Sequence, residues 1–296
     1  MQILNKYITK IKKSNSALKD VSSVAGGTVI AQVIGILLMP VISRIYSPAD
    51  YGIVAVFASA ITILSVISGL GYFYAIPLPK LDRHANAVII LTISIQCIFT
   101  ILLTLALFTM SINIFVKIGL KDLYKYKMLL PPAVFFIGLY NTFTQWGIRS
   151  KSFYAIGKTK VLQSITGNIT KIFLGICSVR PMGLILGDII SRASGTATLY
   201  KGIVSVKGIP KTTSQDIRRV AIRYRNFPLF DVWSNLLNTA GYHLVPYMIM
   251  IFYDSHTTGS FSMAFTLMAI PSAVIGTAIG QVFYQRAASA HHSGNL

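Results

Sequence analysis

The sequence predicts an all-α membrane protein, a polytopic helical bundle with about eight transmembrane helices, on three observations. Hydrophobic residues make up 53% of the 296 residues, and charged residues make up only 12%, against about 25% in soluble domains. The mean hydropathy is +0.63. The apolar residues are gathered in eight runs, each close to the roughly 20 residues that a helix needs to cross a bilayer.

The eight runs follow one another along the chain and are separated by short polar breaks. We expect helices over 21–43, 50–76, 86–112, 128–148, 160–178, 182–203, 228–251 and 258–282. The breaks contain proline or clustered charges, as in R-I-Y-S-P-A-D at 44–50 and V-R-P-M at 179–182. Such residues end helices, so each break is expected to be a turn at the membrane surface.

The net charge of +19 reflects membrane topology rather than a nucleic-acid partner. If the N-terminus is cytoplasmic, 19 of the 27 Lys and Arg residues lie inside, six lie outside and two lie within helices. In membrane proteins, Lys and Arg are in excess in the cytoplasmic loops. A nucleic-acid-binding protein instead gathers its Lys and Arg residues on one face of a soluble domain. We therefore expect a multi-pass protein with its N-terminus in the cytoplasm.

A weak internal repeat links the first and the seventh predicted helices. L-M-P-V-I-S-R-I-Y-S-P-A-D-Y-G at 38–52 resembles L-V-P-Y-M-I-M-I-F-Y-D-S-H-T-T-G at 244–259. Both helices run in the same direction, so the repeat is parallel, as in one class of transporters. The alternative is coincidence within an apolar sequence of low diversity.

The repeat predicts two six-helix lobes. We expect a basic cytoplasmic N-terminus (1–20), an N-terminal lobe (21–203), a cytoplasmic linker (204–227) and the start of a C-terminal lobe (228–296). Two complete copies would need about 410 residues in a transporter built from parallel repeats, so we expect the chain to be a fragment.

Three ionisable residues lie deep in the fifth and sixth predicted helices, which form a hairpin around residue 180. Lys171 comes about nine residues before that turn, and Asp188 and Arg192 about eight and twelve residues after it. At 1.5 Å per residue, Lys171 is therefore within about 3 Å in depth of both. Asp231 lies nearer to a membrane interface.

Two interpretations of this group remain open. Asp188 could form a structural ion pair with Lys171 or Arg192 that clips two helices together. The cations could instead line a hydrophilic passage for an anionic substrate. One acid cannot neutralise two bases, and an unpaired buried cation is costly, which favours a water-filled cavity.

Three helices also carry polar residues at helical spacing. These stripes are Thr92, Gln96, Thr100 and Thr104; Ser164, Asn168 and Lys171; and Asp231, Asn235, Asn238 and Tyr242. Each stripe could hold helices together by hydrogen bonds or face a shared cavity. The candidate substrate-binding residues are Lys171, Arg192, Asp188, Asn168, Asp231, Asn235 and Asn238. Helix packing is the expected role of Gln32, Gln145 and His243.

Sequence signals of catalysis are missing. The chain shows no phosphate-binding loop, no metal-ligand spacing and no catalytic pair of carboxylates. We therefore expect a transporter without a cofactor or a metal.

Several stretches together resemble the Wzx-type polysaccharide flippases of the multidrug/oligosaccharidyl-lipid/polysaccharide exporter superfamily. They are R-I-Y-S-P-A-D-Y-G-I-V-A-V-F at 44–57, R-S-K-S-F-Y-A-I-G-K-T-K-V-L-Q-S-I at 149–165, Y-R-N-F-P at 224–228 and G-Q-V-F-Y-Q-R-A at 280–287. The resemblance implies two six-helix lobes that open alternately around a central cationic cavity.

The implied cargo is an oligosaccharide on undecaprenyl diphosphate, moved across the bacterial cytoplasmic membrane for surface polysaccharide synthesis. Other assembly proteins, such as a polymerase and a chain-length regulator, are then expected partners beside the lipid bilayer. Two alternatives remain. A drug/cation antiporter of the same fold would need acidic binding residues, and a membrane glycan polymerase would normally show a large outer loop.

Overall fold

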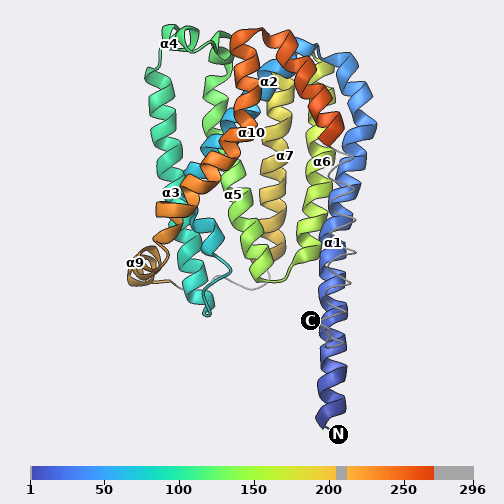
Figure 1. Cartoon of the computed structure of the whole chain (residues 1–296), viewed down its shortest axis with the longest axis vertical. Helices are drawn as coiled ribbons and strands as arrows, with labels where there is room; N and C mark the ends of the chain where they lie inside the picture. Colours follow the sequence, from blue (N-terminus) through green and yellow to red (C-terminus); the bar gives the residue numbers. More distant parts are fainter. Residues whose placement is uncertain (1, 205–211, 270–296) are drawn as a thin grey trace.

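The computed structural model describes residues 2–204 and 212–269, and these residues form a bundle of long helices without a strand (Figure 1). The long helices of the first part are α1 (Gln2–Ile45), α2 (Pro48–Ser68), α3 (Asp82–Thr109), α5 (Leu130–Arg149), α6 (Phe153–Ile176) and α7 (Met182–Leu199). The second part contains α9 (Ser214–Arg223), α10 (Val232–Phe252) and a helix over 255–269. Short helical segments connect them: η1 (Tyr72–Ala75), α4 (Ile112–Lys117), η2 (Lys121–Leu129), η3 (Tyr200–Val204) and η4 (Phe227–Asp231).

The prediction of an all-α membrane protein is confirmed. Each of the eight predicted apolar runs contains a described helix, although the eighth run is described only to residue 269. Within the described residues, three segments are long and apolar enough by themselves to span a membrane: Ser22–Ile45, Pro48–Ser68 and Asp82–Thr109. The remaining long helices carry more polar residues, and these include the polar stripes of α6 and α10.

The prediction of one helix over 50–76 is wrong, because the second apolar run contains two helical segments. Helix α2 ends at Ser68, and Leu70 and Gly71 adopt positive φ angles of 45° and 69° before η1 begins. Glycine takes this left-handed conformation without a steric penalty. A Cβ atom on Gly71 would also crowd Val232 at the start of α10. The glycines of 69–71 thus let the chain turn while the apolar pattern continues.

The loops alternate between the two ends of the bundle. The turns after α1, α3, α6 and α10 lie near α4, and those after α2, α5 and α7 lie near α9 (Figure 1). We refer to these as the α4 end and the α9 end. With a cytoplasmic N-terminus, the breaks at 77–86, 149–160 and 201–227 are predicted to be cytoplasmic, and their described residues lie at the α9 end (Figure 1).

The two copies of the internal repeat have the same local structure. Each long helix has a proline near its C-terminal end, Pro40 in α1 and Pro246 in α10, and is followed by a short turn and a new helix. Ser47 caps α2 in a capping box with Asp50. In the second copy, the Asp254 carboxylate accepts a hydrogen bond of 2.6 Å from the Thr257 amide.

The two copies also touch each other reciprocally. A Cβ atom on Gly52 would collide with the carbonyl oxygen of Ser255, and one on Gly259 would collide with that of Pro48. Ser255 follows Pro48 by 207 residues, and Gly259 follows Gly52 by the same number. The contact therefore has approximate two-fold symmetry, and at this crossing the backbones meet directly because neither glycine has a side chain.

Helix α9 is fastened to the bundle by polar contacts. The Arg83 Nε atom donates a 2.6 Å bond to the Asp216 carboxylate, which also accepts from the Thr213 amide at 3.0 Å. The Asn86 amide group donates to the Thr212 hydroxyl, and the Tyr72 hydroxyl donates to the Ala221 carbonyl oxygen. These bonds join α9 to α3 and η1.

The Asp216 contacts predict a pH dependence. The Thr213 backbone amide, followed by Arg83, lowers the pKa of the Asp216 carboxyl group. A lowered pKa in the folded state stabilises the fold above the unfolded-state pKa of about 4, and this contribution is lost as the pH falls through the folded pKa. We expect Asp216→Asn to lower the Tm at pH 7 and to have a shrinking effect below about pH 4. Thermal unfolding of both proteins across this range checks the prediction, and a Tm difference that persists at acid pH contradicts it.

Candidate functional site

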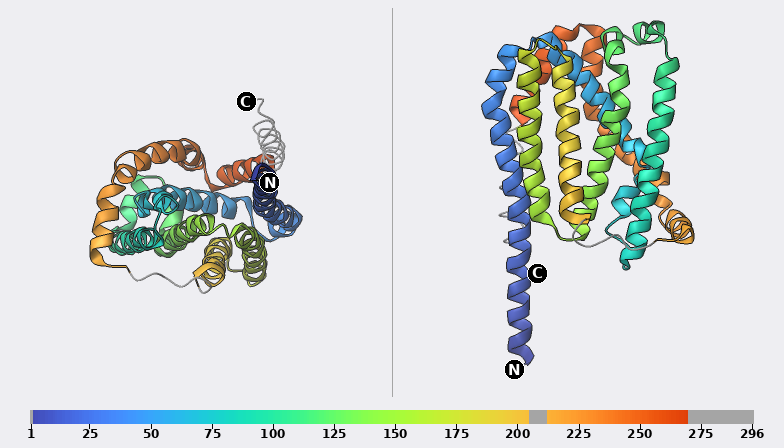
Figure 2. Two further views of the ribbon diagram at one scale, coloured as in Figure 1. Left: turned by 90° about the horizontal axis from the view of Figure 1, so that it is seen from below. Right: turned by 180° about the vertical axis from the view of Figure 1, so that it is seen from behind.

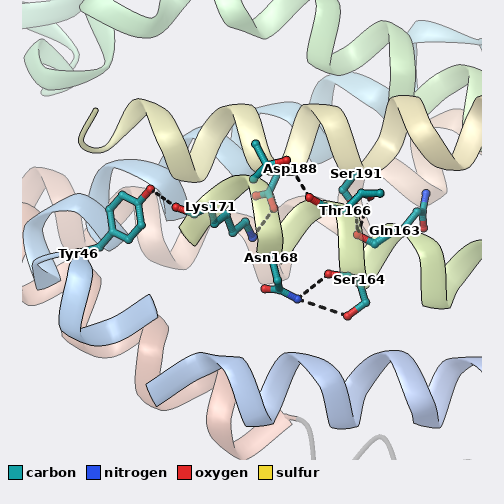
Figure 3. Close-up of polar contacts among 9 residues, drawn as sticks. Tyr46, Gln163, Ser164, Thr166, Asn168, Lys171, Asp188 and Ser191 are labelled. Atoms are coloured by element: carbon teal, nitrogen blue, oxygen red, sulfur yellow. Dashed lines mark hydrogen bonds and ion pairs between the residues drawn. The ribbon is translucent and has the colours of Figure 1, made fainter. Parts of the chain in front are cut away.

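The polar centre of the bundle lies between α6 and α7, which run antiparallel from the turn at 177–181 (Figure 3). The Lys171 ammonium group and the Asp188 carboxylate form an ion pair of 2.6 Å. The side chains are 22% and 45% exposed, respectively. The pair is therefore partly accessible rather than sealed in the protein interior.

Arg192 lies one helical turn beyond Asp188 on α7 and is exposed. Within 2–204 and 212–269, its guanidinium group has neither an ion pair nor a hydrogen bond. Arg192 and Asp188 line the same cavity of about 120 Å³ between α2, α5 and α7. The other lining residues are Ala58, Ile61, Thr62, Ala133, Ile137 and Ile189. The cavity thus combines apolar walls with two charged groups.

Further hydrogen bonds fix the hairpin, and sequence reasoning missed their donors. The Tyr46 hydroxyl donates to the Lys171 carbonyl oxygen at 2.7 Å, and the Ser191 hydroxyl donates to the Gln163 carbonyl oxygen at 2.8 Å (Figure 3). The Thr166 and Ser194 hydroxyls are 2.9 Å apart. Ser191 and Ser194 are one turn apart on α7, which is a signal that the sequence contained.

Asn168 lies one turn from Ser164, which connects α6 to α1, and its own hydrogen bonds stay within α6. Its amide nitrogen donates to the Ser164 carbonyl oxygen at 2.7 Å, and the Ser164 hydroxyl donates to the Ala31 carbonyl oxygen at 2.8 Å. In the stripe of Ser164, Asn168 and Lys171, Ser164 therefore joins α6 to α1, whereas Asn168 bonds within α6. Only Lys171 pairs with a charged group on another helix.

The stripe on η4 and α10 lies elsewhere. Asp231 and Asn238 are exposed and Asn235 is half-buried, and α10 packs mainly on α2 and η4 rather than on α6 or α7. In the described part of the chain, no hydrogen bond or ion pair joins these residues to Lys171, Asp188 or Arg192. The structure therefore does not gather all seven candidate residues in one site.

Only Gln96 of the stripe on α3 makes a hydrogen bond to another helix in the described part of the chain. Thr92 and Gln96 are fully buried, and the Gln96 amide donates to the Thr142 hydroxyl of α5 at 3.2 Å. The Thr92, Thr100 and Thr104 hydroxyls bond to carbonyl oxygens one turn back in their own helix. Helix α3 also stands apart from α6 in the bundle (Figure 1). This stripe therefore does not face the α6–α7 site.

The two interpretations of the charged group both find support in the geometry. Lys171 and Asp188 form the predicted clip between two helices. Arg192 remains as an uncompensated cation beside the cavity. Over the described residues, no group of three or more His, Cys, Asp or Glu side chains could hold a metal ion. The arrangement can attract an anion through a cation and its neighbouring charge pair.

Comparison with known proteins identifies the family. Neither a curated protein nor a solved structure gives a significant match to the chain. A family model described as "Polysaccharide biosynthesis protein" matches residues 41–293, which is most of the chain. The matched region contains residues 41–52 of the first copy of the internal repeat, the whole second copy, and the Lys171–Asp188 pair with Arg192. The chain belongs to this polysaccharide biosynthesis protein family.

Proposed function

We propose that the protein is a flippase for a lipid-linked oligosaccharide in the bacterial cytoplasmic membrane. It would turn a glycan carried on undecaprenyl diphosphate from the inner to the outer leaflet for surface polysaccharide synthesis. Lipopolysaccharide O-antigen, capsule and exopolysaccharide are the candidate products. The family, the apolar helical bundle and the parallel repeat support this proposal.

In this proposal the α9 end faces the cytoplasm, because the predicted cytoplasmic breaks that are described lie there. The diphosphate is attracted to Arg192 and the Lys171–Asp188 pair, while hydroxyl and amide groups contact the sugars. The lipid tail stays in the bilayer, so that only the polar headgroup crosses. Alternating access of the two lobes moves the headgroup without a catalytic step.

The observation that carries the proposal is the unpaired cation at the cavity. An uncompensated charge in an apolar bundle is costly unless water or an anion meets it. Arg192 has this environment, and Asp188 is already paired with Lys171. The same pairing disfavours a cation antiporter, because Asp188, the carboxylate that lines this cavity among the described residues, is already bound to a base.

Loss of the cations should abolish transport. We expect Arg192→Ala and Lys171→Ala to reduce the surface glycan at least tenfold, since a single charge-assisted bond contributes about 1.5–3 kcal/mol. Surface glycan per cell, normalised to the amount of membrane-inserted protein, is the measurement. Lys121→Ala, an exposed lysine near the α4 end, is the matched control and should leave the glycan unchanged. Wild-type glycan levels in both test variants would rule out the proposed site.

Thiol labelling tests whether water reaches the site. Cys97 and Cys177 are free, so both are first replaced by serine. We expect a membrane-impermeant thiol reagent to label Arg192→Cys in this background and not Thr142→Cys, because Thr142 is completely buried. Equal resistance of the two cysteines would mean that the charged groups only hold helices together.

A further inference from the structure

Helix α9 has one side fixed to the protein and one side free of it. Ile217 and Val220 pack against the apolar cluster formed with η1, α3 and α5. The Asp216 carboxylate lies on the fixed side and is bound by Arg83. Asp216 is also the only acid between residues 212 and 230. The carboxylate of Asp216 is therefore already paired with Arg83 on the fixed side, and it does not neutralise the basic residues on the other side of α9.

The free side of α9 is strongly basic. Arg218, Arg219 and Arg223 are exposed, as is Arg225 directly after the helix. None of them has an ion pair in the part of the chain that the structure describes. Between these arginines lies Ile222, whose side chain is 58% exposed. We refer to Arg218, Arg219, Arg223 and Arg225 as the arginine face.

Three exposed apolar residues follow the arginine face along the chain. Leu229 and Phe230 in η4 and Trp233 at the start of α10 are 55%, 68% and 61% exposed. Tryptophan and phenylalanine are common where a protein surface meets the boundary between headgroups and acyl chains. Along 218–233, arginines suited to the headgroup layer are followed by large apolar side chains suited to the acyl-chain layer.

The orientation of α9 suits a membrane surface. Seen from the α9 end, α9 lies across the margin of the bundle, outside α3, and α10 then continues along the edge of the bundle (Figure 2). A basic amphipathic helix in this orientation lies in the plane of the headgroups. The fixed contacts to Arg83, Asn86 and Tyr72 hold it there before any lipid binds.

We propose that the arginine face binds the anionic headgroups of phospholipids in the leaflet at the α9 end. Guanidinium groups bind phosphate oxygens through paired hydrogen bonds, and clustered basic residues beside a membrane helix attract acidic lipids. Leu229, Phe230 and Trp233 contact the upper acyl chains. This binding is separate from the transport site, and either proposal can fail without the other.

Trp233 supplies a direct test. The protein has two tryptophans, and Trp146 is only 7% exposed. The full chain is reconstituted into vesicles that contain phosphatidylcholine or phosphatidylglycerol brominated near the headgroup, and quenching of Trp233 is measured. We expect the wild type to select phosphatidylglycerol over phosphatidylcholine roughly tenfold. The triple variant Arg218→Gln, Arg219→Gln, Arg223→Gln should show no preference.

Three controls make the result decisive. Lys117→Gln, Lys121→Gln and Lys125→Gln remove the same charge from exposed positions near the α4 end and should keep the preference. Trp233→Phe should remove the lipid-dependent quenching. Dissolved inorganic phosphate should not displace the lipid, whereas displacement would indicate a soluble anion site and overturn the proposal. Equal quenching by both lipids in the wild type, or an unchanged preference in the arginine variant, would also overturn it.

Discussion

Replacing Gly52 with leucine is expected to destabilise the protein far more than the same replacement at Gly35 or Gly241. The backbone of α2 meets that of the helix over 255–269 at this point, and a Cβ atom would collide with the Ser255 carbonyl oxygen. Overpacking of this kind costs about 1–3 kcal/mol, and the cost is at the upper end where the obstacle is backbone. Thermal unfolding in detergent is the measurement.

Two controls separate this steric effect from helix propensity. Gly35 and Gly241 also lie within helices, but a Cβ atom at either would meet nothing within 4 Å. Leucine at these positions should leave the Tm unchanged or raise it slightly, because glycine is a poor helix former. Gly259→Leu should match Gly52→Leu, since the contact is reciprocal. Equal Tm values for Gly52→Leu and Gly241→Leu would mean that the two copies do not cross here.

The largest electrostatic effect is expected from removing Asp188 alone. Asp188→Leu leaves Lys171 without its partner, close to Arg192, which has no ion-pair partner in the described residues even when Asp188 is present. Breaking a fully buried pair costs about 3–5 kcal/mol, and we expect about 1–3 kcal/mol here because both side chains are partly exposed. Equilibrium unfolding in a denaturing detergent measures the loss.

A double-mutant cycle separates the structural role of the Lys171–Asp188 ion pair from that of Arg192, the unpaired cation beside it. The variant with both Lys171→Met and Asp188→Leu should be more stable than Asp188→Leu alone, because no charge of the pair remains unpaired. Arg192→Met should instead leave stability nearly unchanged, since Arg192 has no partner in the described residues. Additive effects of the two substitutions in the pair would contradict the ion pair.

Much of the fold could be predicted because each feature depends on local sequence. The lengths of the apolar runs predict where the helices lie. The charges of the loops divide the breaks into two sets, and in the structure these two sets lie at opposite ends of the bundle (Figure 1). The depth of Lys171 and Asp188 followed from helix rise and a single tight turn. The break after Ser68 was missed because the apolar pattern continues through Gly71.

The site was harder to predict, because it depends on which helix faces which. The sequence shows that Asn235 and Asn238 share a helix with Asp231, but not that α10 packs on α2 instead of α7. The bond from Tyr46 to Lys171 spans 125 residues, and the pair of Arg83 and Asp216 spans 133. Such contacts have no local signature in one sequence.

The hydrogen bonds of the α6–α7 hairpin have a consequence for substitutions. Tyr46 and Ser191 donate to main-chain oxygens of residues 171 and 163, and every amino acid offers that acceptor. The residue at 171 can therefore change its charge without losing the bond that anchors its helix. A substitution that alters the charge of the Lys171–Asp188 pair therefore leaves this anchor of the scaffold in place.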